Sequence, residues 1–439
     1  MIFARYPLAV ILVLSALIRL VYVLWFADYP AYLFSDMRGY WSRALEYADG
    51  DVTAYNQWRL SPVFAHAVLG EILIVLRSLG LPEGAQLGVV LLLNVAMSVA
   101  STYFVFDMAW RFSHRRGQAL AAAAIFGFFP ALIHYDAFVL SENPTIFTVL
   151  LSLWLTLKYR RNSGPLLVAG LALGCATMFR TVMGLIGLPC FLFLVAANRD
   201  LRSLLRGAVF SVGYFAVVLA SVANVYQVSG GQITGASAVG GLNFFFMACK
   251  ARAVVSQHQM PAYYVIPPSR GVDSQRGNYI TKEPYHNQAY FFALGSECIR
   301  ENPWVLFDNL LEVRHLFFTN FFPGLVPPNH AAAWRVVIRD ASQWLAFAMF
   351  ASLGLVGLLY RRPEYDRHIL NLLLSIVFVQ LVTMYFFLFE HRYVYPFLVA
   401  VLLPFVGVVT VLARERRGLG VGYGLATLVV GALLFWAAP

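Results

Sequence analysis

The chain has 439 residues, of which 60% are hydrophobic and 12% are charged, and its net charge is +10. Soluble domains carry roughly 45–50% apolar and about 25% charged residues, so this composition excludes an ordinary soluble protein. The Lys and Arg residues stand in short clusters between apolar runs, which is typical of membrane loops and argues against nucleic-acid binding.

Apolar runs of about twenty residues recur along the chain, and each can cross a hydrocarbon layer of roughly 30 Å. The first run follows Arg5 and has no cleavage site, so we expect an uncleaved helix. A further apolar stretch, 61–80, contains His66, Glu71 and Arg77, which are costly near the bilayer centre, so we expect it to lie along the interface. The eleven predicted spans are 7–27, 86–110, 118–138, 143–159, 165–180, 182–198, 206–226, 340–360, 368–389, 393–413 and 421–437.

The basic clusters decide the orientation of these spans. With eleven spans, the clusters all fall on one side, which the positive-inside tendency makes the cytoplasm. The N-terminus is then inside and the C-terminus outside. The predicted fold is an all-α polytopic membrane protein with a bundle of about 11 helices. Its parts are an N-terminal catalytic module (1–226, with a first outer loop at 28–85), a long outer loop (227–339) and C-terminal helices (340–439).

The four cysteines are too few for a disulfide framework. Cys175 and Cys190 lie in apolar runs and are expected to be packing residues. Cys249 and Cys298 share the long outer loop, where a bridge between them requires an oxidising compartment. The sequence leaves this pairing open.

Two acidic residues stand at outer helix boundaries. Asp36 precedes Tyr40 and Ala44 at helical spacing, so a short interfacial helix is expected to begin near it. Glu142 stands between Ser141 and Asn143 at the start of a predicted span. A helix cap or a favourable helix dipole would explain either acid. Paired carboxylates at one membrane depth also suit a general base or a metal site.

Several cations are predicted on the same outer side. Arg180 ends an apolar run, and a guanidinium there can anchor the helix in the interface or bind phosphate oxygens in pairs. Arg392 follows His391 in a short polar segment between two apolar runs. Lys250 and Arg252 follow an aromatic segment. Two acids and several cations beside lipid are what transfer from an anionic lipid phosphate needs.

The order of these motifs resembles the GT-C superfamily of polyprenyl-phosphate-sugar transferases, such as protein mannosyltransferases and aminoarabinose-type lipid A transferases. The features that carry the resemblance extend along nearly the whole chain. They are Ser35-Asp36 with Tyr40 and Ala44, the stretch from Ser61-Pro62 to Gly80, Ser141-Glu142, Gly170-Gly174-Arg180, Gly240 to Phe244, Ile299 to Pro303, and His391 to Pro396.

The resemblance implies a sugar donor on a polyprenyl phosphate and an envelope lipid, polysaccharide or protein as acceptor. It implies that Asp36 is the catalytic acid or base and that Glu142 is a second acid of the site. The residues expected to bind substrate are Tyr40, Arg59, Arg180, Asn243, Lys250, Arg252, His391 and Arg392. A divalent metal, Mg²⁺ or Mn²⁺, is left open, because Met37 stands where many relatives have a second acid.

The expected enzyme is therefore an inverting glycosyltransferase in a bacterial inner membrane, with its active site facing the periplasm and Asp36 as general base. Two other functions are weighed against it. A lipid-linked glycan flippase or transporter predicts inverted repeats and polar residues near the midplane, whereas this sequence keeps its charges at the outer boundary. An O-antigen ligase or polymerase is expected to rely on Arg and His in place of an early Asp.

Overall fold

Most of the predicted apolar runs fold as helices. The computed structural model describes residues 6–27, 33, 35–51, 63–196, 200–228, 231, 235, 240–250, 252–254, 263–265, 287–308, 333–386 and 394–415. The first half contains α2 (Pro7–Val21), the π-helix η1 (Tyr22–Phe26), α3 (Ser35–Ala48), α5 (Val63–Ser78), α6 (Glu83–Ser113), α7 (Arg116–Gly127), α8 (Pro130–Tyr135), α9 (Glu142–Lys158), α10 (Ser163–Phe179), the 3₁₀ helix η3 (Thr181–Ile186), α11 (Gly187–Ala196) and α12 (Leu201–Val228). The second half contains α13 (Gly240–Cys249), β1 (Arg252–Val254), β2 (Tyr263–Val265), α14 (Gln288–Glu301), α16 (Ala333–Ala351), η5 (Ser352–Leu355), α17 (Gly357–Tyr360), α18 (Arg367–Phe386), η7 (Tyr395–Phe397) and α19 (Leu398–Glu415).

The molecule is an integral, multi-pass membrane protein. Within the described residues, five helices are long and apolar enough to span a bilayer on their own, namely Pro7–Phe26, Glu83–Ser113, Leu201–Gln227, Arg367–Phe386 and Tyr395–Arg414. Shorter apolar helices, including α10, cover other predicted spans, and the last one (421–437) lies outside the described residues. The number of eleven spans therefore stays a prediction.

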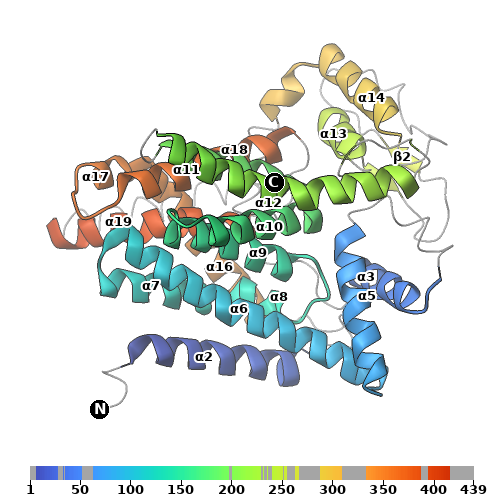
Figure 1. The fold of residues 1–439 in the computed structure, drawn as a ribbon, viewed down its shortest axis with the longest axis horizontal. Coiled ribbons are helices and arrows are strands. Elements are labelled where there is room, and N and C mark those ends of the chain that lie inside the picture. Colours follow the sequence, from blue (N-terminus) through green and yellow to red (C-terminus); the bar gives the residue numbers. More distant parts are fainter. Residues whose placement is uncertain are drawn as a thin grey trace.

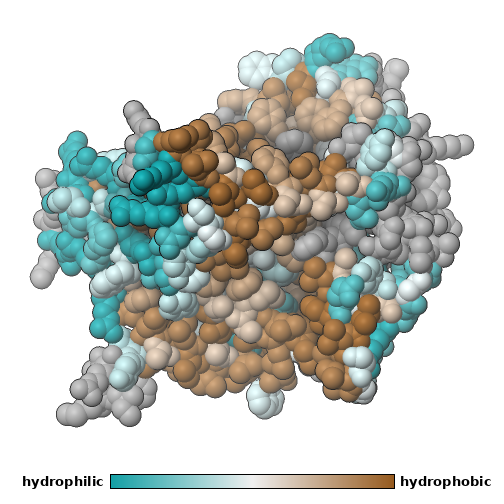
Figure 2. All heavy atoms as spheres, in the orientation of Figure 1, coloured by the Kyte–Doolittle hydropathy of each residue, from teal (hydrophilic) through white to brown (hydrophobic). Residues whose placement is uncertain are grey.

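The surface of the bundle (Figure 1) has a hydrophobic band and a hydrophilic end (Figure 2). In Figure 1, α2, α6, α10 and α12 run in about the same direction across the view. Figure 2 shows a hydrophobic band over these helices, with a strongly hydrophilic end around α17. The helices α3, α5, α13 and α14 gather at the opposite end (Figure 1). We call this opposite end the outer end.

The predicted span 118–138 is not one helix, which corrects the sequence analysis. Helix α7 ends at Gly127, and α8 begins at Pro130. A proline inside a continuous helix would remove a hydrogen bond and clash with the preceding turn, whereas the first helical position tolerates it. The break leaves the carbonyl of Gly127 without a helical partner, and it accepts hydrogen bonds from Ser15 (3.0 Å) and Arg19 (3.1 Å) of α2.

Helices α3 and α5 form a pair at the outer end. Met37, Trp41 and Ala44 form the buried face of α3, and the Tyr47 hydroxyl donates to Glu71 of α5 at 2.6 Å. In Figure 1, α5 runs across the ends of the long helices and not alongside them. This course agrees with the predicted interfacial position of 61–80, which stays a prediction.

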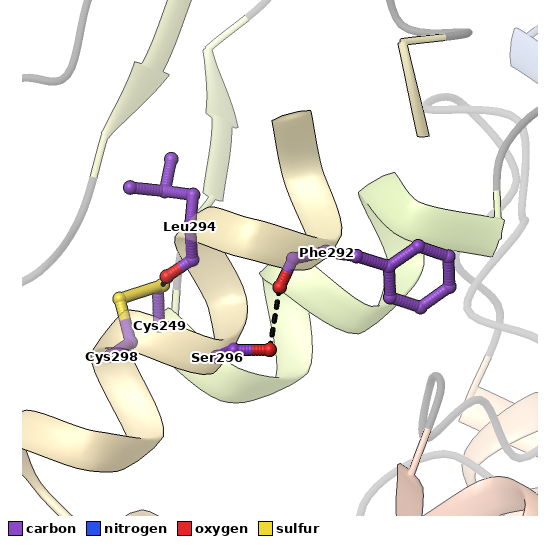
Figure 3. Close-up of a disulfide and its surroundings, with 5 residues drawn as sticks. All are labelled: Cys249, Phe292, Leu294, Ser296 and Cys298. Carbon is purple, nitrogen blue, oxygen red and sulfur yellow. Dashed lines mark hydrogen bonds between the residues drawn. A yellow bond between two sulfur atoms is a disulfide. The ribbon is translucent and has the colours of Figure 1, made fainter. Parts of the chain in front are cut away.

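The segment 227–339, predicted to be a long outer loop, contains a small folded unit. Helices α13 and α14 pack through a separate apolar cluster that includes Phe245 and Phe291, and the disulfide Cys249–Cys298 joins them with a Cα–Cα distance of 5.3 Å (Figure 3). Strands β1 and β2 pair antiparallel beside α13. The all-α prediction is thus incomplete, because this loop adds a short hairpin, and the disulfide left open by the sequence is formed.

Glycines allow α10 and α12 to touch through their backbones. A Cβ atom built on Gly170 would lie 2.0 Å from the Phe210 carbonyl oxygen, and one on Gly213 would lie 2.3 Å from the Leu167 carbonyl oxygen. Small residues permit such close approach of membrane helices, whose association relies on packing. This contact also places the end of α10, and therefore Arg180.

We expect Gly170→Ala to destabilise the protein by about 1–3 kcal/mol, the usual cost of overpacking. The matched control is Gly164→Ala in the same helix, where an added Cβ meets nothing within 4 Å. The control should be neutral or slightly stabilising, because alanine is the better helix former. Thermal unfolding in detergent measures both, and equal melting temperatures would contradict this packing.

The interfacial position of α5 is testable by labelling. Leu79 is exposed just after α5, and Arg161 is exposed in a predicted cytoplasmic turn. In a background with Cys175→Ser and Cys190→Ser, a membrane-impermeant maleimide added to intact cells should label Leu79→Cys and not Arg161→Cys. Labelling of Leu79→Cys only after permeabilisation would refute the eleven-span topology.

Candidate functional site

Two ion pairs are buried at the outer end of the helix bundle. The first joins Arg19 of α2 to Asp136, with a distance of 2.5 Å from Nη1 to Oδ2 and no exposed surface on either side chain. Asp136 Oδ1 also accepts hydrogen bonds from Ser98 of α6 (2.6 Å) and Asn143 of α9 (3.0 Å). Asp136 therefore connects three helices through its carboxylate.

The second ion pair joins Glu142 at the first position of α9 to Arg180, which caps the C-terminal end of α10. Glu142 is 1% exposed and Arg180 is 8% exposed. Burying a charge costs several kcal/mol unless it has a well-placed partner, so each of these two residues depends on the other. The N-terminal end of the α9 dipole also favours a carboxylate at this position.

The residues on either side of Glu142 do not cap the start of α9. Ser141 is the residue before the first turn, but its side chain makes no capping hydrogen bond. Asn143 does not cap the helix either, because its amide donates back to the Tyr135 carbonyl (3.3 Å) and to Asp136. The helix start is therefore held by contacts with α8 and with the turn that follows it.

Helix α3 brings Asp36 toward this helix start. The helix begins at Ser35, which confirms that a short helix starts near Asp36. The Tyr40 hydroxyl lies 3.4 Å from the Ser141 hydroxyl, next to Glu142. Asp36 precedes Tyr40 by four residues and so lies one turn away on the same side of α3. The Asp36 side chain is exposed, which leaves it accessible to a polar substrate.

An apolar cavity of about 300 Å³ lies beside the second ion pair. Helices α3, α5, α6 and α9 supply most of its walls, and Asn94 is one of the few polar residues in the lining. Ser141 and Phe179 also line it, and they directly precede Glu142 and Arg180 in the sequence. The volume is at the lower end of the range of about 300–1,000 Å³ for ligand pockets.

His66 of α5 is buried between α3 and the cavity wall. Arg43 Nη1 donates to His66 Nε2 at 2.9 Å, which leaves the ring proton on Nδ1. The ring also contacts that of Tyr40, with 4.9 Å between the centroids. Burial, followed by the Arg43 charge, lowers the pKa of His66 from 6.5 to about 3. His66 is thus neutral at physiological pH.

The structure describes only some of the predicted substrate-binding residues. It brings Tyr40, Glu142 and Arg180 together, with Asp36 one turn from Tyr40. Asn243 is half-buried on α13, Lys250 follows that helix with a left-handed backbone (φ 51°), and the backbone of Arg252 lies in β1. Arg59, His391 and Arg392 lie outside the described residues.

Arg19 and Asp136 were not among the site residues predicted from the sequence. Arg19 lies in the middle of an apolar run, and an ionisable residue within a predicted span is by itself a sign of a buried partner or a functional site. That signal was present in the sequence. Its partner could not be identified, because Asp136 is 117 residues away.

The described residues contain no group of three or more His, Cys, Asp or Glu side chains that could hold a metal ion. One oxygen of the Glu142 carboxylate, Oε1, is bonded to Arg180. Whether the site binds a divalent metal, Mg²⁺ or Mn²⁺, therefore stays open.

Comparison with known proteins supports the resemblance found in the sequence. Residues 81–226 match the family model described as dolichyl-phosphate-mannose-protein mannosyltransferase, which confirms the resemblance to lipid-phosphate-dependent membrane glycosyltransferases over this segment. The segment contains Asp136, Glu142 and Arg180. No curated protein matches the chain.

One similar solved structure is the archaeal oligosaccharyltransferase AglB from Archaeoglobus fulgidus, in complex with an inhibitory peptide and a dolichol-phosphate. The sequence identity is 13% and the TM-score is 0.48. The match covers 99% of this chain and 55% of that chain, so this protein spans little more than half the length of its neighbour.

The low pKa of His66 predicts a pH-dependent stability. The unfolded chain gains a proton as the pH falls from about 6.5 toward 3, whereas the folded protein does not. The stability that depends on neutral His66 is therefore complete above pH 6.5 and is lost as the pH falls. We expect the melting temperature of His66→Phe to fall less steeply between pH 6.5 and 4.5 than that of the wild type.

The matched control for this experiment is His368→Phe, because His368 is exposed on α18 at the opposite end of the bundle. The control should keep the pH dependence of the wild type. Parallel curves for His66→Phe and the wild type would contradict the buried neutral histidine.

Proposed function

We propose that this protein is a glycosyltransferase that moves a sugar from a polyprenyl-phosphate donor to a hydroxyl acceptor at the outer face of the membrane. The observation that carries the proposal is the apolar cavity next to the Glu142–Arg180 pair. A polyprenyl-phosphate sugar needs a dry groove for its chain and a cation for its phosphate, and the two occur side by side here. The family match over 81–226 agrees with this class of enzyme.

In this proposal, the first isoprene units of the donor occupy the cavity between α3, α5, α6 and α9. The phosphate lies against Arg180, whose guanidinium has five N–H donors and can hold a carboxylate and a phosphate oxygen together. The ion pair with Glu142 is made through Nη2. Glu142 therefore acts as the residue that orients the cation, and the N-terminal end of α9 adds its dipole.

The other predicted residues complete the polar part of the site. We assign Lys250 and Arg252 of the outer unit, together with Arg392, to the phosphate and its sugar. Asn243, Arg59 and His391 are assigned to substrate hydroxyls. Lys250 and Arg252 follow the disulfide-bonded end of α13, in a unit that lies at the same end of the molecule as α3 and α5 (Figure 1). These assignments extend the proposal beyond the ion pair.

The proposed chemistry is a single displacement. Asp36 takes the proton of the acceptor hydroxyl while the oxygen attacks the anomeric carbon of the donor. The bond between that carbon and the phosphate oxygen breaks, and the polyprenyl phosphate leaves with the electron pair. Arg180 stabilises the charge on this leaving group, so no acid is needed there. Attack opposite the leaving group inverts the anomeric configuration.

The proposed location is the periplasmic face of a bacterial inner membrane. The disulfide Cys249–Cys298 supports an oxidising compartment for the outer unit, because such bonds are rare in the reducing cytosol. The acceptor would then be an envelope lipid, a polysaccharide or a protein. The exposed position of Asp36 suits an acceptor that approaches from the aqueous side.

We expect Asp36→Asn to reduce kcat by about 10² to 10⁴, the usual contribution of a general base. The change preserves shape, so the melting temperature and the affinity for polyprenyl phosphate should stay close to those of the wild type. The control is Asp51→Asn, which removes an exposed acid just after α3 and should retain activity. Turnover is measured with polyprenyl-phosphate sugars, and NMR gives the anomeric configuration of the product.

Two results would refute this mechanism. An Asp36→Asn enzyme that keeps more than about a tenth of the wild-type kcat would exclude Asp36 as the base, given the size of that contribution. A product with retained anomeric configuration would exclude single displacement, whatever the effect of the substitution.

A further inference from the structure

Asp136 is the most completely buried acid among the described residues, and it lies outside the cavity. Its carboxylate receives hydrogen bonds from Arg19, Ser98 and Asn143. The side chain of Arg19 in turn donates to backbone carbonyls of Leu132 (3.3 Å) and Gly127 (3.1 Å). Both oxygens of Asp136 are thus directed at fixed partners on α2, α6 and α9.

Hydrogen bonds from α6 and α9 also fix the turn between α8 and α9, which leads to the second ion pair. Asn94 of α6 donates to the carbonyl of Phe138 at 2.9 Å and to that of Asp136 at 3.4 Å. Asn143, the neighbour of Glu142, donates to Asp136 from the first turn of α9. The turn between α8 and α9 is therefore held at both of its ends around the Asp136 carboxylate.

We propose that Asp136 is a positioning residue, which acts through Asn143 to fix Glu142 and thereby Arg180 beside the cavity. This inference rests on the proposed function, in which Arg180 holds the phosphate of the donor. Glu142 follows the turn directly, so a shift of the first turn of α9 would move the Glu142 carboxylate and the guanidinium that it orients. Misplacement by about 1 Å can cost a factor of 10² in an enzyme.

Arg19 holds the Asp136 carboxylate in place. Removing one partner of a buried ion pair strongly destabilises a protein. After a single substitution of Arg19 or Asp136, a weaker binding of donor could therefore come from unfolding and not from a shift of Glu142 and Arg180. The bond between Asp136 and Asn143 offers a cleaner test. It can be broken and rebuilt while Arg19 keeps an oxygen acceptor at position 136.

Asn143→Asp breaks this bond. In the wild type, the Asn143 amide lies 3.0 Å from Asp136 Oδ1, and the substitution places a second carboxylate there. The rebuilding variant combines Asn143→Asp with Asp136→Asn. In it, the amide introduced at position 136 donates to the carboxylate at 143 and to Ser98, and its oxygen still accepts from Arg19, so that only the longer bond from residue 143 to the Tyr135 carbonyl (3.3 Å) is not rebuilt. The net charge of the cluster is the same as in the wild type.

The readout is the Kd for polyprenyl phosphate, measured by calorimetry on the full-length protein in detergent, with the melting temperature measured in parallel. We expect Asn143→Asp to raise this Kd by at least about tenfold, equivalent to about 1.4 kcal/mol, and the double variant to return it to within about twofold of the wild type. A merely structural role would change the melting temperature and leave the Kd unchanged.

Two further variants keep the test decisive. Ser98→Ala removes the 2.6 Å hydrogen bond to Asp136 with little loss of volume, and it should raise the Kd by about threefold even if Asn143→Asp fails to fold. Thr102→Val, one turn along α6, removes a buried hydroxyl that bonds only to the Ser98 carbonyl of its own helix. It should leave the Kd unchanged.

Arg180→Lys separates this inference from the proposed function. It keeps the charge and removes the planar fork, so it should raise the Kd if Arg180 holds the phosphate. A raised Kd for Arg180→Lys together with unchanged values for Ser98→Ala and Asn143→Asp would overturn the positioning role alone. Failure of the double variant to restore the Kd would also overturn it. An unchanged Kd for Arg180→Lys would place the phosphate elsewhere and overturn the proposed function.

Discussion

Charge is costly inside a hydrocarbon layer, yet the outer end of this helix bundle contains two ion pairs whose side chains are all less than a tenth exposed. The Arg19–Asp136 pair joins the first helix to the turn before α9. The Glu142–Arg180 pair joins the start of α9 to the end of α10. Because the amide of Asn143 bonds to Asp136, one residue links the two pairs. Each of these four buried charges requires its partner. The relative positions of α2, α6, α9 and α10 at this end therefore depend on the two ion pairs.

The same constraint gives the outer end its chemical character. An apolar cavity lies beside the Glu142–Arg180 pair, and residues of α3 and α5 form part of its wall. A lipid chain, a phosphate and a polar acceptor need three different environments within a short distance. In the proposed function, the cavity takes the lipid chain, the Glu142–Arg180 pair takes the phosphate, and the exposed Asp36 on α3 faces the acceptor. The close backbone contact of α10 with α12 at Gly170 then keeps Arg180 at its place.

Much of this arrangement could be predicted from sequence, and the reasons for the failures are physical. Hydrophobic periodicity is a local property of the sequence, so the helices that begin near Asp36 and at Glu142 were predicted. Pro130 is also a local signal, and the predicted single span 118–138 did not take account of it. The pairing of Arg19 with Asp136 depends on which helices become neighbours, which no local pattern records. The cavity likewise arises from side chains of four helices. The resemblance to lipid-phosphate glycosyltransferases could be predicted because it rests on the order of short motifs along the chain. That order can be read from the sequence without knowing which helices contact one another.

In the proposed function, a polyprenyl-phosphate donor binds with its chain in the cavity and its phosphate at Arg180. A cryo-EM structure of the protein in nanodiscs with bound polyprenyl phosphate tests this most directly. The account predicts phosphate density within about 3.2 Å of the Arg180 guanidinium, the limit for a hydrogen bond. It also predicts chain density between α3, α5, α6 and α9. A head group bound at the opposite end of the bundle, with the cavity empty, would contradict the account.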